Sequence, residues 1–133
     1  MRLSKRSEYA LLALIDLAEH DDVRTVAALE ISKRKHIPKK YLDQILNMLK
    51  RGGYVRSYRG AEGGYHLAKD AGEISLADVI RLLDGPLAPV ESVSRHFHEH
   101  TPIEQNRKLL DVFRDIRDAV ARKLETTTVA DLV

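Results

Sequence analysis

Cysteine is absent from the 133-residue sequence. Disulfide bonds, thiolate metal sites and iron–sulfur clusters held by cysteine are therefore excluded, because each needs sulfur ligands. No apolar stretch approaches the roughly 18–20 residues that a membrane-spanning helix needs. The apolar run near the N-terminus is interrupted by Glu8, Asp16 and Glu19, and no small-residue cleavage site follows it, so it lacks the pattern of a signal peptide. We expect a soluble, cytoplasmic protein.

The sequence also lacks the patterns of common catalytic and nucleotide-binding sites. Residues 59–68, RGAEGGYHLA, have glycines spaced as G-x-x-G-G. This spacing matches neither the G-x-G-x-x-G of a dinucleotide fold nor the G-x-x-x-x-G-K-[ST] of a P-loop. No nucleophile–base pair stands out elsewhere in the chain. We therefore expect that the protein is not an enzyme.

Charge is unevenly distributed along the chain. The formal net charge is only +2, yet residues 24–60 contain ten basic and two acidic side chains. Residues 1–23 and 61–133 carry net charges of −2 and −4. A block of +8 in a nearly neutral chain is typical of a surface that binds a polyanion, although a run of cations can also be an ordinary solvated surface.

The spacing of apolar residues predicts three short helices in the first half of the chain. The first covers residues 5–20, with Ser4 as its N-cap. A short second helix follows Thr25, whose hydroxyl would cap it. The third helix begins at Pro38 and ends at Gly52.

Residues 54–59 and 64–68 are two runs rich in β-forming residues around a glycine-bearing tip, so they predict a β-hairpin. Three helices followed by a hairpin is the order of a winged helix-turn-helix, in which the last helix before the hairpin reads DNA. We expect a mainly α fold with a small β-hairpin. The basic block covers the second helix, the reading helix and the first strand, so charge and topology indicate one nucleic-acid-binding surface.

The second half of the chain predicts two further helices. One opens with Ser75 as its N-cap. A long helix opens with Thr101 as N-cap and Pro102 at its first position, and it runs to about residue 125. We divide the chain into three parts: a winged helix-turn-helix DNA-binding domain (1–84), a connecting or effector loop (85–101), and a dimerisation helix with a C-terminal turn (102–133).

The candidate DNA contacts lie on the N-terminal segment, the reading helix and the hairpin. Glutamine pairs bidentately with adenine, and lysine and arginine reach guanine or phosphate. Glycines at the hairpin tip permit positive φ and a close backbone approach to DNA, although an ordinary turn uses glycines in the same way. The candidates are Arg2, Ser4, Lys5, Lys39, Lys40, Tyr41, Gln44, Lys50, Arg51, Arg56, Tyr58, Arg59, Gly60, Gly63, Gly64 and Tyr65.

Three further expectations concern this surface. Lys33, Arg34 and Lys35 are additional candidates for phosphate contacts. Tyr41 suits a phosphate contact and core packing equally well. Valine in place of Gly63 or Gly64 is expected to weaken DNA binding more than folding, if the wing backbone lies against DNA.

The segment from Tyr41 to Glu91 resembles the Rrf2 family of bacterial transcription regulators. The resemblance is carried by Y-L-[DE]-Q followed by RG-x-x-GGY-x-L, and it extends over nearly the whole chain. It implies a homodimer on a palindromic operator, with the long C-terminal helix as the dimer element. It also implies base reading by the helix that carries Tyr41 and Gln44, assisted by the wing. We expect a repressor; a winged-helix module that binds an acidic protein is the alternative.

Many members of this family hold an iron–sulfur cluster on three cysteines that precede the long helix. In this chain the first of those positions matches Ser92, and no cysteine exists anywhere. Hydroxyls are poor iron ligands beside thiolates. The chain therefore resembles the cluster-free branch of the family, and we expect no cofactor.

The connection contains three alternating histidines, His96, His98 and His100. In an extended segment all three would share one face, and in a helix His96 and His100 would pair at i, i+4. Glu91 or Glu99 could add oxygen ligands, and Ser92 lies in the same candidate segment. A metal-sensing regulator, a pH-sensing loop and a site for a small-molecule or protein effector are open alternatives. The plain alternative is a polar loop whose imidazoles are solvated.

The long helix carries an apolar stripe on one side. A helix of this length rarely finds enough cover within a chain of this size, so we expect the stripe to pair with a second copy; packing on its own domain is the alternative. The stripe comprises Leu109, Val112, Phe113, Ile116, Val120 and Leu124.

Overall fold

Three helices precede a two-stranded hairpin in the computed structural model, which describes residues 2–22, 25–88, 93 and 100–133. The strands are antiparallel, with Val55 opposite Leu67 and Tyr58 opposite Gly64. The order confirms the winged helix-turn-helix topology and the mainly α fold class. The elements are α1 (Lys5–Glu19), α2 (Ala28–Lys35), α3 (Lys39–Arg51), β1 (Val55–Tyr58) and β2 (Gly64–Leu67).

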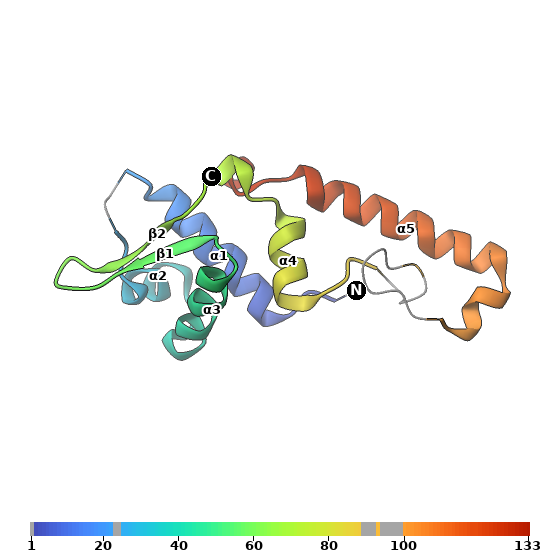
Figure 1. Cartoon of the computed structure of the whole chain (residues 1–133), viewed down its shortest axis with the longest axis horizontal. Helices are drawn as coiled ribbons and strands as arrows, with labels where there is room; N and C mark the ends of the chain where they lie inside the picture. The colour runs from blue at the N-terminus through green and yellow to red at the C-terminus, as the bar shows by residue number, and fades with distance from the viewer. Residues whose placement is uncertain (1, 23–24, 89–92, 94–99) are drawn as a thin grey trace.

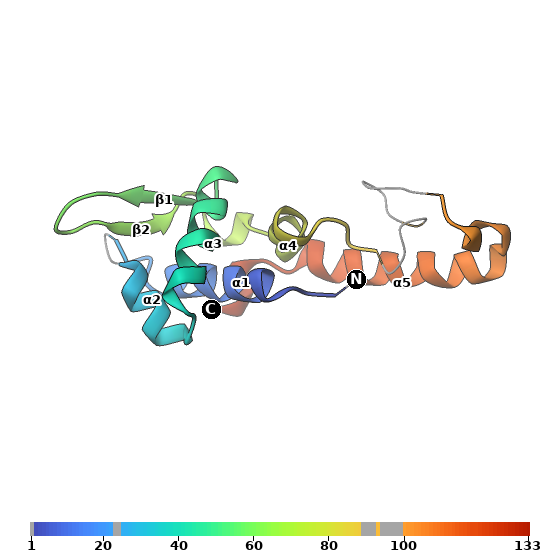
Figure 2. The same ribbon diagram turned by 90° about the horizontal axis from the view of Figure 1, so that it is seen from below.

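The rest of the chain forms a shorter helix and a long one that extends away from the hairpin (Figure 1). The hairpin formed by β1 and β2 is called the wing. The wing and the N-terminal end of the long helix project from opposite sides of the helical cluster, as the second view also shows (Figure 2). The long helix α5 has 20 residues, which corresponds to about 30 Å at ~1.5 Å per residue. The elements are η1 (Ala71–Glu73), α4 (Leu76–Asp84), η3 (Pro102–Gln105), α5 (Arg107–Thr126) and η4 (Val129–Leu132).

Helix α3 is positioned by its apolar side. Its buried residues are spaced i, i+3, i+4 and i+7, so they form one stripe that packs into the main hydrophobic core beside α1. They are Leu42, Ile45, Leu46 and Leu49, and each is at most 1% exposed. Burying this stripe leaves the opposite side of α3 in solvent.

Two of the expected helix caps are confirmed. The Ser4 side chain accepts a hydrogen bond from the Ser7 amide at the start of α1. The Ser75 side chain accepts one from the Asp78 amide at the start of α4. Each cap satisfies one of the backbone N–H groups that a helix leaves without an internal partner.

Two other caps are wrong. Helix α2 begins at Ala28 without a side-chain cap, because the Thr25 hydroxyl instead donates to the Glu62 carbonyl of the wing at 2.6 Å. Thr101 precedes only the short 3-10 turn η3. The long helix starts later, at Arg107, where the Asn106 side chain accepts from the Leu109 amide. Asparagine is among the best N-cap residues, and this local bond sets the boundary.

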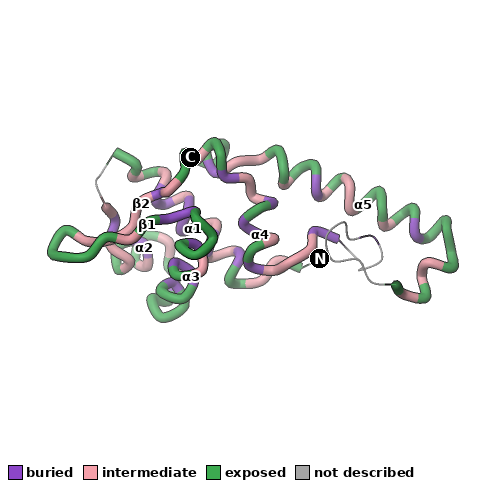
Figure 3. Tube along the Cα trace, in the orientation of Figure 1, coloured by how far each residue is buried: buried purple, intermediate pink, exposed green. Residues whose placement is uncertain are grey.

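The chain after α5 returns to the main core. The Leu76 amide donates to the Thr127 carbonyl at 3.0 Å, and the Val129 amide donates to the Ile74 carbonyl at 2.9 Å. The Val129 side chain is fully buried against the same core that holds α1 and α3. Exposure along the chain follows this arrangement, since α5 has few buried positions between its ends (Figure 3).

The wing is fastened to the segment before α2. Val26 and Tyr65 exchange two backbone hydrogen bonds, of 2.8 and 2.9 Å. A Cβ added at Gly64 would lie 2.5 Å from the Val26 carbonyl oxygen, and one added at Gly63 would lie 2.5 Å from that of Tyr58. These two glycines therefore allow the protein's own backbone segments to approach each other. We therefore expect valine at either position to destabilise the fold as well as to weaken DNA binding.

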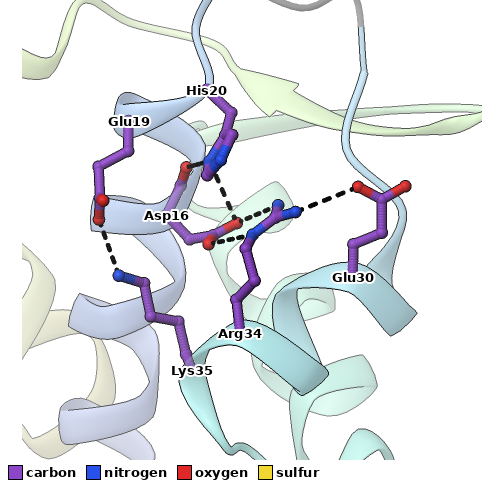
Figure 4. A network of polar contacts seen from close by, with 6 residues as sticks. All are labelled: Asp16, Glu19, His20, Glu30, Arg34 and Lys35. Carbon is purple, nitrogen blue, oxygen red and sulfur yellow. Dashed lines mark hydrogen bonds and ion pairs between the residues drawn. The ribbon is translucent and has the colours of Figure 1, made fainter.

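A network of ion pairs joins α1 to α2 (Figure 4). The Asp16 carboxylate is fully buried, and it accepts hydrogen bonds of 2.9 Å from both Nε and Nη2 of Arg34. Hydrogen bonding to Asp16 raises the pKa of Arg34 despite the opposing effect of burial. Nearby, Lys35 Nζ lies 2.7 Å from Glu19 Oε1. The paired charges fix the second helix on the first.

Replacing Arg34 by alanine would leave the buried Asp16 carboxylate without its main partner. We expect Arg34→Ala to lower the free energy of unfolding by about 3 kcal/mol, because an unpaired buried charge is costly. Urea denaturation measures this. Lys33→Ala removes an exposed cation from the same helix and should change stability by less than about 0.5 kcal/mol. Equal effects of the two variants would refute a structural role for the pair.

Alanine at Gly64 should destabilise the fold rather than the DNA complex alone. Its Cβ would clash with the Val26 backbone, and its φ of +156° is rarely adopted by residues with a side chain. We expect a loss of roughly 1–3 kcal/mol, measured as a lower melting temperature. Gly60→Ala is the control, because Gly60 also has positive φ but meets nothing within 4 Å. A Gly64→Ala protein that melts no earlier than Gly60→Ala would contradict the packing argument.

Candidate nucleic-acid interface

The solvent-facing side of α3 presents a row of four long or polar side chains. All four are exposed, whereas the apolar stripe on the other side is buried. Within the described residues, none of these side chains is held by a hydrogen bond or an ion pair. Arginine and lysine read guanine or phosphate, and the two amides suit adenine. The row, called here the outward row, consists of Lys40, Gln44, Asn47 and Arg51.

Asn47 was missed by the sequence reasoning, although the signal was available. Positions 40, 44, 47 and 51 are separated by four, three and four residues, which places them on one face of a helix. The apolar stripe of this helix is visible in the sequence, so the residues on the opposite, solvent-facing side can be predicted from the same spacing. Asparagine pairs with adenine in the same way as glutamine.

Several cations of the +8 block are already engaged within the chain. Arg34 and Lys35 bind Asp16 and Glu19, so they are poor candidates for phosphate contacts. Lys39 Nζ lies 3.0 Å from Asp43 Oδ2, one helical turn away. This pair is half-exposed at both ends and therefore weak, which leaves Lys39 able to exchange its partner. Lys33 and Lys50 are exposed cations that have no ion-pair partner among the described residues.

The wing divides into an exposed tip and an anchored base. Arg56, Tyr58 and Arg59 are exposed, and Gly60 has φ of +105° at the tip. Tyr65 lies differently: its side chain packs against the main core and its backbone pairs with Val26. The candidate wing contacts therefore concentrate on β1 and the tip, and Tyr65 holds the wing in place.

The N-terminal segment is tied to the end of α4. The Ser4 amide donates to Asp84 Oδ2 at 2.8 Å, and the Ser4 hydroxyl donates to Oδ1 of the same carboxylate. Burial alone would raise the pKa of Asp84, but hydrogen bonds from Ser4 and the charge of Arg6 lower it below its ordinary value. Ser4 is thus a cap and a tether, whereas Arg2 and Lys5 are exposed beside it.

The apolar stripe of α5 splits into two sets. Phe113 packs against a small cluster of Ala88, Val93 and Leu110, and Leu124 packs against another cluster near α4. Val120 is half-buried. The remaining three residues face solvent: Leu109 is 44% exposed, Val112 52% and Ile116 43%. Packing on the chain's own residues therefore applies to one part of the stripe, and pairing of the three exposed residues with a second copy stays a prediction.

Most of the candidate effector residues lie outside the described part of the chain: Glu91, Ser92, His96, His98 and Glu99. His100 is described, and its Nδ1 lies 2.7 Å from Glu104 Oε2. Among the residues that the structure describes, no three His, Asp or Glu side chains converge into a group that could hold a metal ion. In the same part of the chain, no helix combines the length and apolarity needed to cross a bilayer.

A family model described as "Rrf2: Iron-dependent Transcriptional regulator" matches residues 3–133. The chain offers no thiolate, so its donor set does not fit a cluster held by cysteines. Any dependence on iron would have to use nitrogen or oxygen ligands.

The similarity extends to individual relatives. The chain is 39% identical over 132 residues to Rv1287 of Mycobacterium tuberculosis, an alignment that covers 99% of this chain and 81% of the relative. It is 33% identical over 132 residues to the HTH-type transcriptional regulator CymR of Bacillus subtilis, covering 99% and 89%.

Solved structures show the same fold. CymR, the global cysteine regulator of B. subtilis, matches with a TM-score of 0.81 at 32% identity, covering 99% of this chain and 95% of that chain. IscR of T. potens matches with a TM-score of 0.77 at 27% identity, covering 99% and 85%. With the family model spanning almost every residue, the chain is a member of the Rrf2 family of transcriptional regulators and not an enzyme.

Proposed function

We propose that the protein is a sequence-specific repressor that binds a palindromic DNA operator as a homodimer. The observation that carries the proposal is the outward row on α3. Its four side chains make no hydrogen bond or ion pair with the described residues, and they suit base edges and phosphates. The proposed site of action is the cytoplasm, because the bacterial chromosome lies there. Repression is the simplest consequence of occupying DNA at a promoter.

The proposed complex places α3 in the major groove. The buried stripe of α3 faces the core, so the outward row is the side that a groove can receive. The wing would lie beside it, with Arg56, Tyr58 and Arg59 against the sugar–phosphate backbone. Phosphate contacts supply most of the affinity, and the amides of the outward row supply the sequence preference.

The dimer is proposed to form through α5. Leu109, Val112 and Ile116 are spaced three and four residues apart and are exposed on a helix that projects from the rest of the chain (Figure 1). Apolar side chains at this spacing form a helix–helix seam. One reading helix contacts few base pairs, and a two-fold dimer reads two half-sites about 34–36 Å apart.

The signal is proposed to act without an iron–sulfur cluster. No cysteine is present to hold one. A small molecule, a protein or a metal bound by the histidines of the connection would be the effector. A metal-sensing role is compatible with the contact between His100 Nδ1 and Glu104, because a metal-binding imidazole commonly donates its other ring N–H to a carboxylate.

Substitutions on α3 should separate base reading from phosphate binding. We expect Gln44→Ala to cost about 1–3 kcal/mol on the cognate site and to relax its sequence preference. Lys50→Ala should weaken binding to all duplexes alike and reduce the slope of log Kd against log salt concentration by about 1. Fluorescence anisotropy on cognate and random duplexes at several salt concentrations measures both effects.

Gln105→Ala is the matched control, because Gln105 is exposed on η3 far from α3. It should leave both duplexes unaffected. If Gln44→Ala lowered the affinity for cognate and random DNA equally, the assignment of Gln44 to a base contact would be refuted. A protein that prefers no duplex sequence at all would favour the alternative, a winged-helix module with an acidic protein partner.

Aspartate at Ile116 should disrupt the proposed seam. The charge would be buried without a partner in the dimer, which costs several kcal/mol, so we expect Ile116→Asp to be monomeric and to lose tight operator binding. Light scattering measures the mass, and anisotropy the affinity. Arg114→Asp places the same group two residues away, on the opposite, exposed side of α5, and should remain dimeric. A dimeric Ile116→Asp protein with normal affinity would place the contact elsewhere.

A further inference from the structure

A pocket of about 260 Å³ lies between the N-terminal parts of α1 and α3. It is lined mainly by apolar atoms. Helix α1 contributes Lys5, Arg6 and Tyr9, and α3 contributes Tyr41, Gln44 and Ile45. Gln44 belongs to the outward row, so the pocket opens beside the surface proposed to enter the major groove, and its interpretation rests on that proposed function.

The lining residues differ in depth. Ile45 is 1% exposed and belongs to the main core, and Tyr9 packs against the same core. Tyr41 is 55% exposed, so its ring forms a wall that is open to solvent. Such a recess has a fixed apolar base and a wall that can close over a small group. Removing an apolar group from water into it is favourable, whereas a polar base edge would lose hydrogen bonds there.

The major-groove edge of B-DNA carries one apolar group, the C5 methyl of thymine. Glutamine pairs with the N6 and N7 atoms of adenine, and adenine is paired with thymine. An adenine bound by the Gln44 amide would therefore bring the methyl group of its paired thymine near the pocket, which Gln44 lines, and a thymine in the adjacent step would present a second one. We propose that this pocket receives the C5 methyl of one thymine in each operator half-site.

The charges at the mouth fit this occupant. The C5 edge of a pyrimidine lies on the side of its own sugar–phosphate backbone, so a methyl in the pocket would bring that strand toward Lys5 and Arg6. Arg6 Nη2 donates to the Leu83 carbonyl at 3.2 Å, which orients its side chain. Lys5 Nζ lies 3.3 Å from Glu8 Oε2, but the lysine side chain is 79% exposed. Such a surface pair is weak and can be exchanged for a phosphate.

Deoxyuridine tests the proposal, because it lacks only the methyl group of thymidine. Genomic fragments retained by the purified protein define the operator. Each thymine of a half-site is then replaced in turn, and the Kd is measured by anisotropy at one salt concentration. We expect one position to weaken binding about fourfold, the effect of losing one buried methyl group. The other positions should change little.

Two tyrosine variants connect that position to the pocket. Tyr41→Ala removes the exposed wall, and the ratio of the two Kd values, for thymine and for uracil, should fall to about one at the sensitive position. Tyr58→Ala makes the same change on a wing tyrosine of similar exposure, 47%. Tyr58→Ala is expected to weaken binding to both duplexes alike. The ratio of the two Kd values should stay at its wild-type value, because Tyr58 does not line the pocket.

Three outcomes overturn the assignment. A protein that binds its operator specifically but is insensitive to uracil at every position has no methyl pocket, although the proposed DNA reading stands. Sensitivity that persists in Tyr41→Ala places the methyl site elsewhere. Toluene serves as a probe of the pocket. If it displaces DNA from the wild type but not from Tyr41→Ala, and uracil has no effect at any position, the pocket is assigned to a free small molecule. Failure to retain any specific fragment would instead refute the proposed function.

Discussion

The buried carboxylate of Asp16 is the constraint on which the DNA-binding end of the molecule depends. An anion at 0% exposure must be paired, and Arg34 reaches it from α2 with two hydrogen bonds of 2.9 Å. The second helix is therefore held in one position on the first. Its last turn leads into His36, which has a left-handed φ of 55°, and then directly into α3. The orientation of the outward row thus depends on a charge pair that is not part of that row.

The Asp16–Arg34 pair also changes how much of the basic block, residues 24–60, is available to bind a polyanion. A formal +8 over residues 24–60 suggests a uniform cationic surface, but part of that charge neutralises Asp16 and Glu19 inside the chain. The cations that remain available lie on α3, beside it and on the wing. Net charge over a segment therefore overstates the field that a duplex would meet. The distribution of partners, rather than the count of lysines and arginines, decides which face can bind a polyanion.

Local patterns predicted the fold well wherever a single element determined them. The apolar stripe of α3, the caps at Ser4 and Ser75 and the hairpin were all visible in the sequence, because periodicity and capping act over a few residues. The errors arose where a long-range contact competed with a local one. Thr25 bonds to the wing instead of capping a helix. Gly64 is shaped by Val26, a residue 38 positions earlier in the sequence. Patterns that span only a few residues cannot predict such long-range contacts.

The long helix α5 is joined to α3 by packed elements, so the dimer seam proposed on α5 would set the spacing of the two α3 helices. At its C-terminal end, Arg81 of α4 lies 2.6 Å from Glu125, and Val129 is buried against the core that contains α1. Toward its other end, Arg117 donates to the Val93 carbonyl at 2.6 Å, and Leu110 packs against Val93. Rotation of α5 would thus strain the contacts with α4, whose end holds Ser4 at the start of α1 through Asp84. Close-packed interiors transmit such displacements instead of absorbing them. The orientation of α5 and the direction of α3 are therefore coupled through α4 and α1.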